Sequence, residues 1–132
     1  MSSQINVSAD LFELPQMMAF IRSCGSTLKS PDLRKLELAL EESLVNIIQH
    51  AYPQTPGGIE IHFTPYYDYL IFTLRDQGFP FNPLLAQPKI GSGSLEERTE
   101  GGLGLLLIRE FMDEMYYTRQ DPYNILTLVK KI

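Results

Sequence analysis

Two hydrophobic periods alternate along the chain, and their order predicts its secondary structure. Residues 4–8, 59–64 and 69–75 carry apolar side chains at every second position, which is typical of strands with one buried face. The first segment is short and precedes two helical segments, so we expect it at an edge of the sheet. The other two, joined by residues 65–68, predict an antiparallel hairpin.

The first helical segment begins near Pro15, a residue suited to the first turn of a helix. Its apolar residues recur at three- and four-residue spacing. Gly25 and Ser26 weaken the later turns. The predicted apolar stripe consists of Leu14, Met18, Ile21, Cys24 and Leu28.

The second helical segment has the stronger pattern. Ser30 is expected to be its N-cap and Pro31 its first helical residue. The helix should run to about Tyr52, because Pro53 disfavours helical geometry in the residue before it. Its predicted apolar stripe consists of Leu33, Leu36, Leu40, Leu44, Ile47 and Ala51.

The last third of the chain begins with a segment that has no hydrophobic period. Residues 81–101 are rich in Pro, Gly, Ser and charge, and long segments of this kind are often lids or binding loops. A helix should follow from Gly101 to Met112, then strands near 115–119 and 125–130. Paired strands with helices gathered between them predict an α+β fold, a two-layer α/β sandwich with helices on one face of the sheet.

Composition limits the classes of protein to consider. The 132 residues, 44% of them hydrophobic, suit one domain spanning residues 1–132. A net charge of −5 provides no general attraction to nucleic acid or anionic membranes. The lone Cys24, the lack of a signal-peptide pattern and an apolar run of only 103–108 predict a cytoplasmic protein that does not enter the membrane.

Three local patterns could carry chemistry, and each also has a simpler interpretation. Glu42, Asn46 and His50 lie one turn apart on the side of the second helix opposite its leucines, where a solvated polar face is the ordinary arrangement. Asp76-Gln77-Gly78 follows a strand and is typical of a tight turn.

The third pattern is Gly101-Gly102-Leu103-Gly104, which opens a helix. It could be a hinge, or it could bind phosphate, because glycines let backbone N–H groups approach an anion at the positive end of the helix dipole. The chain contains no Walker A motif, which excludes a P-loop nucleotide site.

The order of these patterns is more specific than any of them alone. Glu-x-x-x-Asn on a helix, Asp-x-Gly after a strand, a long loop and Gly-x-Gly opening a helix resemble the GHKL (Bergerat) ATP-binding superfamily. More narrowly, residues 42–52 (ESLVNIIQHAY), 76–83 (DQGFPFNP) and 102–117 (GLGLLLIREFMDEMYY) resemble the bacterial anti-sigma-factor serine kinases. The resemblance covers nearly the whole chain. It implies helices over a mixed, mostly antiparallel sheet, with ATP and Mg²⁺ held between the second helix and the long loop.

The resemblance also implies roles for individual residues. Asn46 matches the asparagine that binds Mg²⁺ through its side-chain oxygen, a ligand type that this ion prefers. Glu42 matches the general base. Asp76 matches the acid that accepts a hydrogen bond from the adenine amino group, and Gly78 the glycine that lets the backbone pass close to the base.

Further positions also match the family, and some of them have a second interpretation. His50 lies where relatives place a polar residue near the phosphates, or it packs at the helix end. Arg98 could reach the phosphates from the long loop, or it is a solvated charge. Phe79-Pro80 replaces a second glycine and suggests a stiffer adenine loop. The remaining expected nucleotide contacts are Gly102, Leu103, Gly104 and Leu105 of the glycine box, and Thr127 on the adenine side.

The leading hypothesis is an ATP-dependent serine/threonine protein kinase that phosphorylates an anti-sigma antagonist and sequesters a sigma factor. The resemblance further implies a homodimer formed through the first helix and first strand. An alternative is a nucleotide-dependent regulatory binding module without phosphotransfer. A third is the detached ATP-binding domain of a histidine kinase. We rank it last, because neither His50 nor His62 lies on a dimerisation helix and 132 residues leave no room for one.

Overall fold

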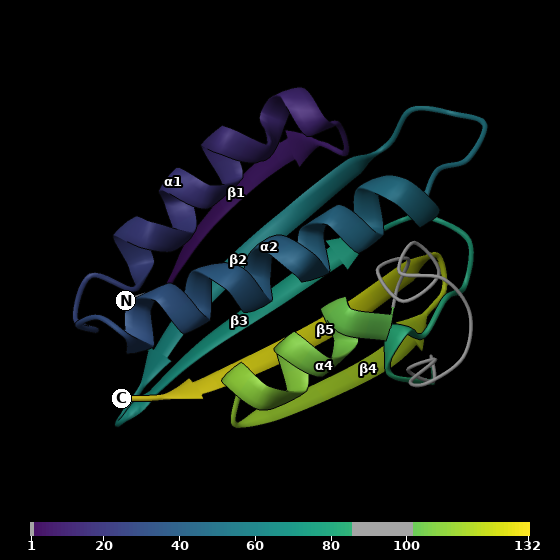
Figure 1. The fold of residues 1–132 in the computed structure, drawn as a ribbon. Helices are drawn as coiled ribbons and strands as arrows, with labels where there is room; N and C mark the ends of the chain where they lie inside the picture. Colours follow the sequence, from purple (N-terminus) through teal and green to yellow (C-terminus); the bar gives the residue numbers. More distant parts are fainter. Residues whose placement is uncertain (1, 86–101) are drawn as a thin grey trace.

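The computed structural model describes residues 2–85 and 102–132, with side chains from residue 106 onward in the second stretch. Five strands form one sheet (Figure 1) in the order β1-β2-β3-β5-β4. The resemblance implied a mixed, mostly antiparallel sheet, and all four pairings of these strands are antiparallel. The predicted edge position of the first strand is confirmed. The strands are β1 Ser3–Ser8, β2 Gly58–Tyr66, β3 Tyr69–Asp76, β4 Glu114–Gln120 and β5 Tyr123–Lys131.

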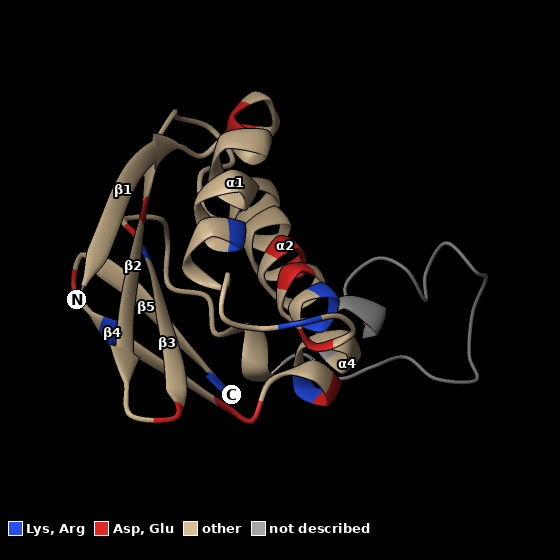
Figure 2. Cartoon of the chain, turned by 90° about the vertical axis from the view of Figure 1, so that its left-hand side faces the viewer, with Lys and Arg blue, Asp and Glu red and all other residues tan. Residues whose placement is uncertain are grey.

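The helices cover one face of this sheet, which confirms the predicted two-layer α+β architecture. In Figure 1, α2 runs diagonally across the sheet and packs between α1 and α4. Figure 2 shows α1, α2 and α4 on the same side of the sheet and acidic positions along α2. The helical elements are η1 Leu11–Glu13, α1 Leu14–Cys24, α2 Asp32–His50, η2 Pro83–Leu85 and α4 Gly102–Phe111. Within the described ranges, no helix combines the length and apolar character needed to cross a bilayer.

The start of α2 differs from the prediction. Ser30 is not its N-cap: Pro31 occupies that position with φ −86° and ψ −4°, the helix begins at Asp32, and no side chain bonds to the free N–H groups. The prediction failed because serine caps a helix only when its own backbone is extended and its oxygen reaches the N2 or N3 amide. Here the chain enters the helix one residue later.

The predicted connection at residues 65–68 is also too long. Pro65 pairs with Leu70 and Tyr66 with Tyr69, so Tyr67 and Asp68 alone form the turn. Tyr67 has φ 52°, in the left-handed region that tight hairpin turns require. Proline is tolerated in β2 at this point because the pairing with β1 stops at Phe63, and no other described strand pairs with that side of β2.

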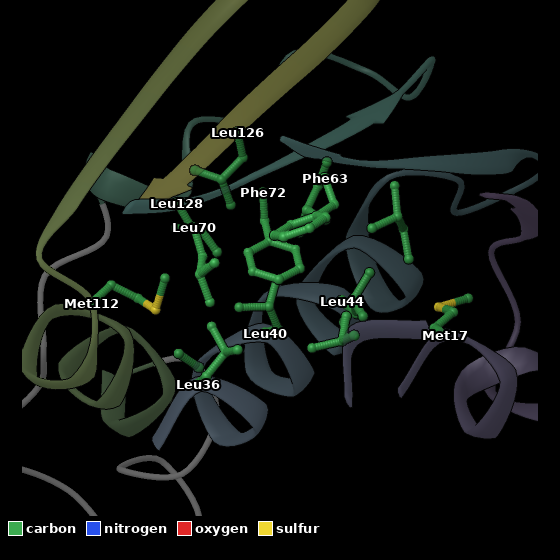
Figure 3. Packing of buried hydrophobic residues seen from close by; sticks show 14 of the residues in the cluster. Met17, Leu36, Leu40, Leu44, Phe63, Leu70, Phe72, Met112, Leu126 and Leu128 are labelled. Carbon is green, nitrogen blue, oxygen red and sulfur yellow. The ribbon is translucent and has the colours of Figure 1, made fainter. Parts of the chain in front are cut away.

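The hydrophobic core lies between the sheet and the helices (Figure 3). Leu36, Leu40 and Leu44 of α2 face Phe72 and its neighbours in β3 and β5. The predicted α1 stripe missed Met17, which is fully buried. Side chains of β3 alternate strictly between the two faces, with Leu70, Phe72, Leu74 and Asp76 all buried. The alternation therefore places the final carboxylate on the helix-covered face, where the sheet ends.

Candidate functional site

A cavity opens at this end of the sheet, beside the C-terminal half of α2, and the space in it, with the open solvent at its mouth included, is about 450 Å³. The walls combine several apolar side chains with a few polar groups, which is typical of small-ligand sites. The lining residues are Ser43, Asn46, Ile47, Ala51, Asp76, Phe81, Pro83, Ile108, Tyr117, Asn124 and Leu126.

Asp76 is the buried carboxylate in the cavity wall, with 5% of its surface exposed. Its Oδ1 accepts hydrogen bonds from the backbone N–H of Gly78 at 2.9 Å and from Nδ2 of Asn124 at 3.0 Å. No described residue donates to the other oxygen, Oδ2. The bonds made at Oδ1 orient the carboxylate, and Oδ2 remains available to a donor on a ligand.

Gly78 is packed against the end of α2 so closely that no side chain fits. A Cβ at this position would lie 2.3 Å from the carbonyl oxygen of Ala51 and 2.6 Å from its Cβ. The next residue, Phe79, donates its N–H to the same oxygen at 3.3 Å. The Asp-x-Gly turn is therefore joined directly to the helix that carries Asn46.

Two further side chains hold this turn from outside the cavity. The Tyr52 hydroxyl accepts a bond from the Gln77 N–H at 2.7 Å and donates to the Gly58 carbonyl at 2.7 Å. Burial raises the pKa of Tyr52, so its hydroxyl keeps the proton that it donates. Arg119 donates from Nη1 to the Gly78 carbonyl at 2.8 Å. The turn is thereby fixed to both β2 and β4.

The polar side of α2 is more enclosed than a solvated face would be. Asn46 lines the cavity. Ser43 is 1% exposed, and its hydroxyl donates to the Ala39 carbonyl at 2.8 Å. Glu42 is half-buried one turn before Asn46, and burial together with the neighbouring Glu41 raises the pKa of its carboxyl. A raised pKa makes the ionised carboxylate a stronger base, which suits a group that takes up a proton.

Not every predicted contact lies at the cavity. Glu42 and His50 are absent from its walls, and the exposed His50 packs its ring 5.6 Å from that of Phe81. Thr127 was expected on the adenine side. However, Asn124 and Leu126 occupy the alternate positions of β5 whose side chains point toward the cavity. Thr127 therefore points to the opposite face of the sheet, because successive side chains of a strand alternate.

The glycine box and the long loop are described only in part. Helix α4 begins at Gly102 as predicted, but Gly101, Arg98 and the rest of 86–101 lie outside the described residues, as do the side chains of Leu103 and Leu105. Among the described residues, no three His, Cys, Asp or Glu side chains are placed to hold a metal ion. A metal at this site would depend on oxygen ligands such as that of Asn46, together with ligand phosphates and water.

Asn124 is the site residue that the sequence interpretation missed. It is 5% exposed, lies 48 positions from Asp76 and bonds directly to its carboxylate. A signal was present, because Asn124 shares the parity of Leu126 and Leu128 and is thus a polar residue at an inward position of an alternating strand.

Residues 7–130 match the family model of the histidine kinase-like ATPase domain, and the chain belongs to this family. Two similar proteins are serine-protein kinases RsbW of Bacillus mycoides and Bacillus cereus, each 33% identical over 99 residues. These matches cover 72% of this chain and 62% of each relative. A crystal structure of RsbU and RsbW domains from Mycobacterium tuberculosis has the same fold, with a TM-score of 0.69, 15% identity and coverage of 99% of this chain and 32% of that one.

Proposed function

We propose that this chain is an anti-sigma-factor kinase that binds ATP with Mg²⁺ in the cavity and transfers the γ-phosphoryl group to a serine or threonine of an antagonist protein. The observation that carries the proposal is that Asn46, Asp76 and Gly78, from two distant segments, meet at one end of the sheet. Similarity to two proteins named serine-protein kinase supports the same reaction.

The chemistry of the described walls supports an adenine nucleotide. Ile47, Ala51 and Leu126 provide apolar surface for a planar base, and Oδ2 of Asp76 can accept a hydrogen bond from its amino group. Asn46 would hold Mg²⁺ through its side-chain oxygen. When bound, that ion neutralises part of the phosphate charge and helps to orient the phosphates.

Glu42 would accept the proton of the attacking hydroxyl, since it lies one helical turn from Asn46 and its raised pKa favours proton uptake. A carboxylate near a triphosphate is otherwise unfavourable, at about 1–4 kcal/mol per charge pair depending on screening. His50, Gly102 and Gly104 would lie toward the phosphates. The role of Thr127 is withdrawn from the proposal because of its orientation.

The experiment combines labelled ATP, Mg²⁺ and a candidate antagonist protein, and scores phosphoserine or phosphothreonine on the antagonist. Glu42→Gln should bind ATP at least as tightly as the wild type, because it removes a negative charge near the phosphates, and should lose phosphotransfer. Glu41→Gln is the matched control, because it removes the same charge at the next residue and should retain transfer. Normal phosphotransfer by Glu42→Gln would refute its role as the base. ATP binding and sigma capture without any phosphotransfer by the wild type would instead favour a regulatory binding module.

The proposed partners are a sigma factor, which the chain would sequester, and the antagonist that it phosphorylates. Because both act on transcription, the proposal also places the protein in the cytoplasm. We further propose a homodimer formed through α1 and β1. Its support is the outer edge of β1, which no described strand pairs with, together with Leu11 and Phe12, which are 58% and 92% exposed. Phe12→Asp should convert a dimer to a monomer in light scattering; a mass that does not change would place the interface elsewhere.

A further inference from the structure

We propose that Asn124 is a positioning residue that fixes the carboxylate of Asp76 and thereby gives the cavity its preference for a purine with a 6-amino group. The inference rests on the proposed nucleotide binding and adds to it a residue outside the motifs that carry the family resemblance. Asn124 lies on β5 with 5% of its surface exposed. It is a polar side chain at a position where the strand otherwise contributes to the core.

All the hydrogen-bonding capacity of the Asn124 side chain is used. Its Nδ2 donates to Oδ1 of Asp76 at 3.0 Å and to the Phe79 carbonyl at 2.9 Å. Its Oδ1 accepts from the Phe81 N–H at 3.3 Å and from the Tyr117 hydroxyl. An asparagine amide offers two N–H groups and one oxygen with two lone pairs, so no capacity is left.

This pattern also fixes which way the amide points. The Phe79 carbonyl can only accept, and the Phe81 N–H can only donate. A flipped amide would place its oxygen against the Phe79 carbonyl and against Oδ1 of Asp76, and its NH₂ against the Phe81 N–H. Asn124 therefore presents a donor to Asp76.

The consequence appears at Asp76. Its Oδ1 already accepts two hydrogen bonds, from Gly78 and Asn124, and no described residue donates to Oδ2. A carboxylate held in this way offers a ligand one acceptor atom, Oδ2, in a fixed position. The 6-amino group of adenine can donate to it, whereas a 6-oxo group would meet it oxygen to oxygen. Without Asn124 the carboxylate loses one of its two fixed bonds and can rotate, so the direction of the acceptor is lost.

The test compares two nucleotides that differ only in the 6-amino group: ATP and purine riboside triphosphate, each with Mg²⁺. Isothermal titration calorimetry gives the affinity of the wild type and of Asn124→Leu, a variant of similar side-chain volume. The wild type should prefer ATP by about 10-fold or more, the usual value of a hydrogen bond to a charged group. Asn124→Leu should bind the two nucleotides equally, with an affinity near that of the wild type for the purine analogue.

Three results separate the possibilities. If the wild type binds neither nucleotide, the proposed function itself fails. If the wild type binds both equally, or if folded Asn124→Leu keeps the preference of the wild type, the role of Asn124 is overturned while nucleotide binding stands. A general loosening of the fold would weaken the binding of both nucleotides by the same factor. It would therefore leave the ratio of the two affinities unchanged, whereas loss of the Asn124 contact should change that ratio.

A second variant, Asn124→Asp, keeps the shape of the side chain and covers the case in which Asn124→Leu does not fold. Among the described residues, the titratable groups in contact with this position are Asp76 and Tyr117. Two carboxylates 3.0 Å apart share a proton and resist losing it. ATP affinity of Asn124→Asp should therefore fall as rising pH removes that proton, unlike the affinity of the wild type.

Asn82→Asp is the matched control. It makes the same charge change in a side chain that caps the Leu84 N–H at 2.9 Å and has no bond to Asp76, so its pH profile should follow that of the wild type. Parallel profiles for Asn124→Asp and the wild type would overturn the proposal.

Discussion

Gly78→Ala tests how the Asp-x-Gly turn is joined to α2. The added Cβ would lie 2.3 Å from the Ala51 carbonyl oxygen, whereas ordinary contacts begin near 3.4 Å. The turn and the helix end must therefore separate by about 1 Å, because the obstructing atoms belong to the backbone and to a short side chain. This displacement would break the 3.3 Å bond from Phe79 to Ala51 and move Asp76.

The expected cost is that of forcing extra volume into a packed site, about 1–3 kcal/mol in the free energy of unfolding. For a chain of this length, each kcal/mol lowers Tm by about 3–5 °C. Urea unfolding with linear extrapolation measures the loss. Calorimetric titration with MgATP should also show an affinity at least about 10-fold weaker, because a shift of about 1 Å disrupts the geometry of a hydrogen-bonded site.

Gly58→Ala is the control within the same chain. A Cβ there would lie 3.4 Å from the Val7 carbonyl oxygen, an ordinary contact, so stability should change by no more than about 0.5 kcal/mol. If Gly78→Ala has the same free energy of unfolding and the same ATP affinity as Gly58→Ala, the close approach of the turn to the helix does not determine the site, and this reasoning is wrong.

Three other measurements test separate contacts. Tyr52→Phe removes two hydrogen bonds from the turn and should lower the free energy of unfolding by about 1–3 kcal/mol in urea titrations; a loss below about 0.3 kcal/mol would contradict the bonds. Burial raises the pKa of the Cys24 thiol to about 11 from its ordinary value of 9.0. Iodoacetamide at pH 8 should therefore label the folded chain about 100-fold more slowly than the unfolded chain, and equal rates would refute this. Because the folded state raises the pKa of Glu42, its ionised form is destabilising. Glu42→Gln should therefore be more stable than the wild type at pH 7, and this difference should vanish below pH 4.5, where the wild-type carboxyl becomes neutral; a difference unchanged by pH would argue against burial of the charge.

The elements that the sequence predicted correctly depend on local periods. The leucine stripe of α2 and the alternation of β2 and β3 arise from side chains a few positions apart. The pattern of apolar residues within a short stretch of sequence is therefore enough to predict these elements. The start of α2 and the turn between β2 and β3 were misplaced by one or two residues. Both errors arose at the ends of secondary-structure elements, where a cap or a turn depends on backbone angles that Ser30 and Pro65 alone do not define.

The candidate site was predicted in part through the family resemblance, which rests on the order of several short motifs. Taken alone, Asp76-Gln77-Gly78 also fits a tight turn, and the helical period puts Asn46 on what could be a solvated face. Thr127 and Asn124 were not assigned correctly in this way. A difference of one strand position reverses the face on which a side chain lies. The alternation in the sequence indicates that Asn124 points inward, but only the register of β5 against β3 shows that it lies opposite Asp76.

The sequence by itself thus determined the order of helices and strands and the presence of an apolar face on each, because these depend on neighbouring residues. Only the tertiary structure decided that β5 pairs between β3 and β4 and brings Asn124 to Asp76. It also decided that Gly78 meets Ala51 without space for a side chain. Such contacts join segments tens of residues apart, and their distances follow from how the whole sheet packs against α2.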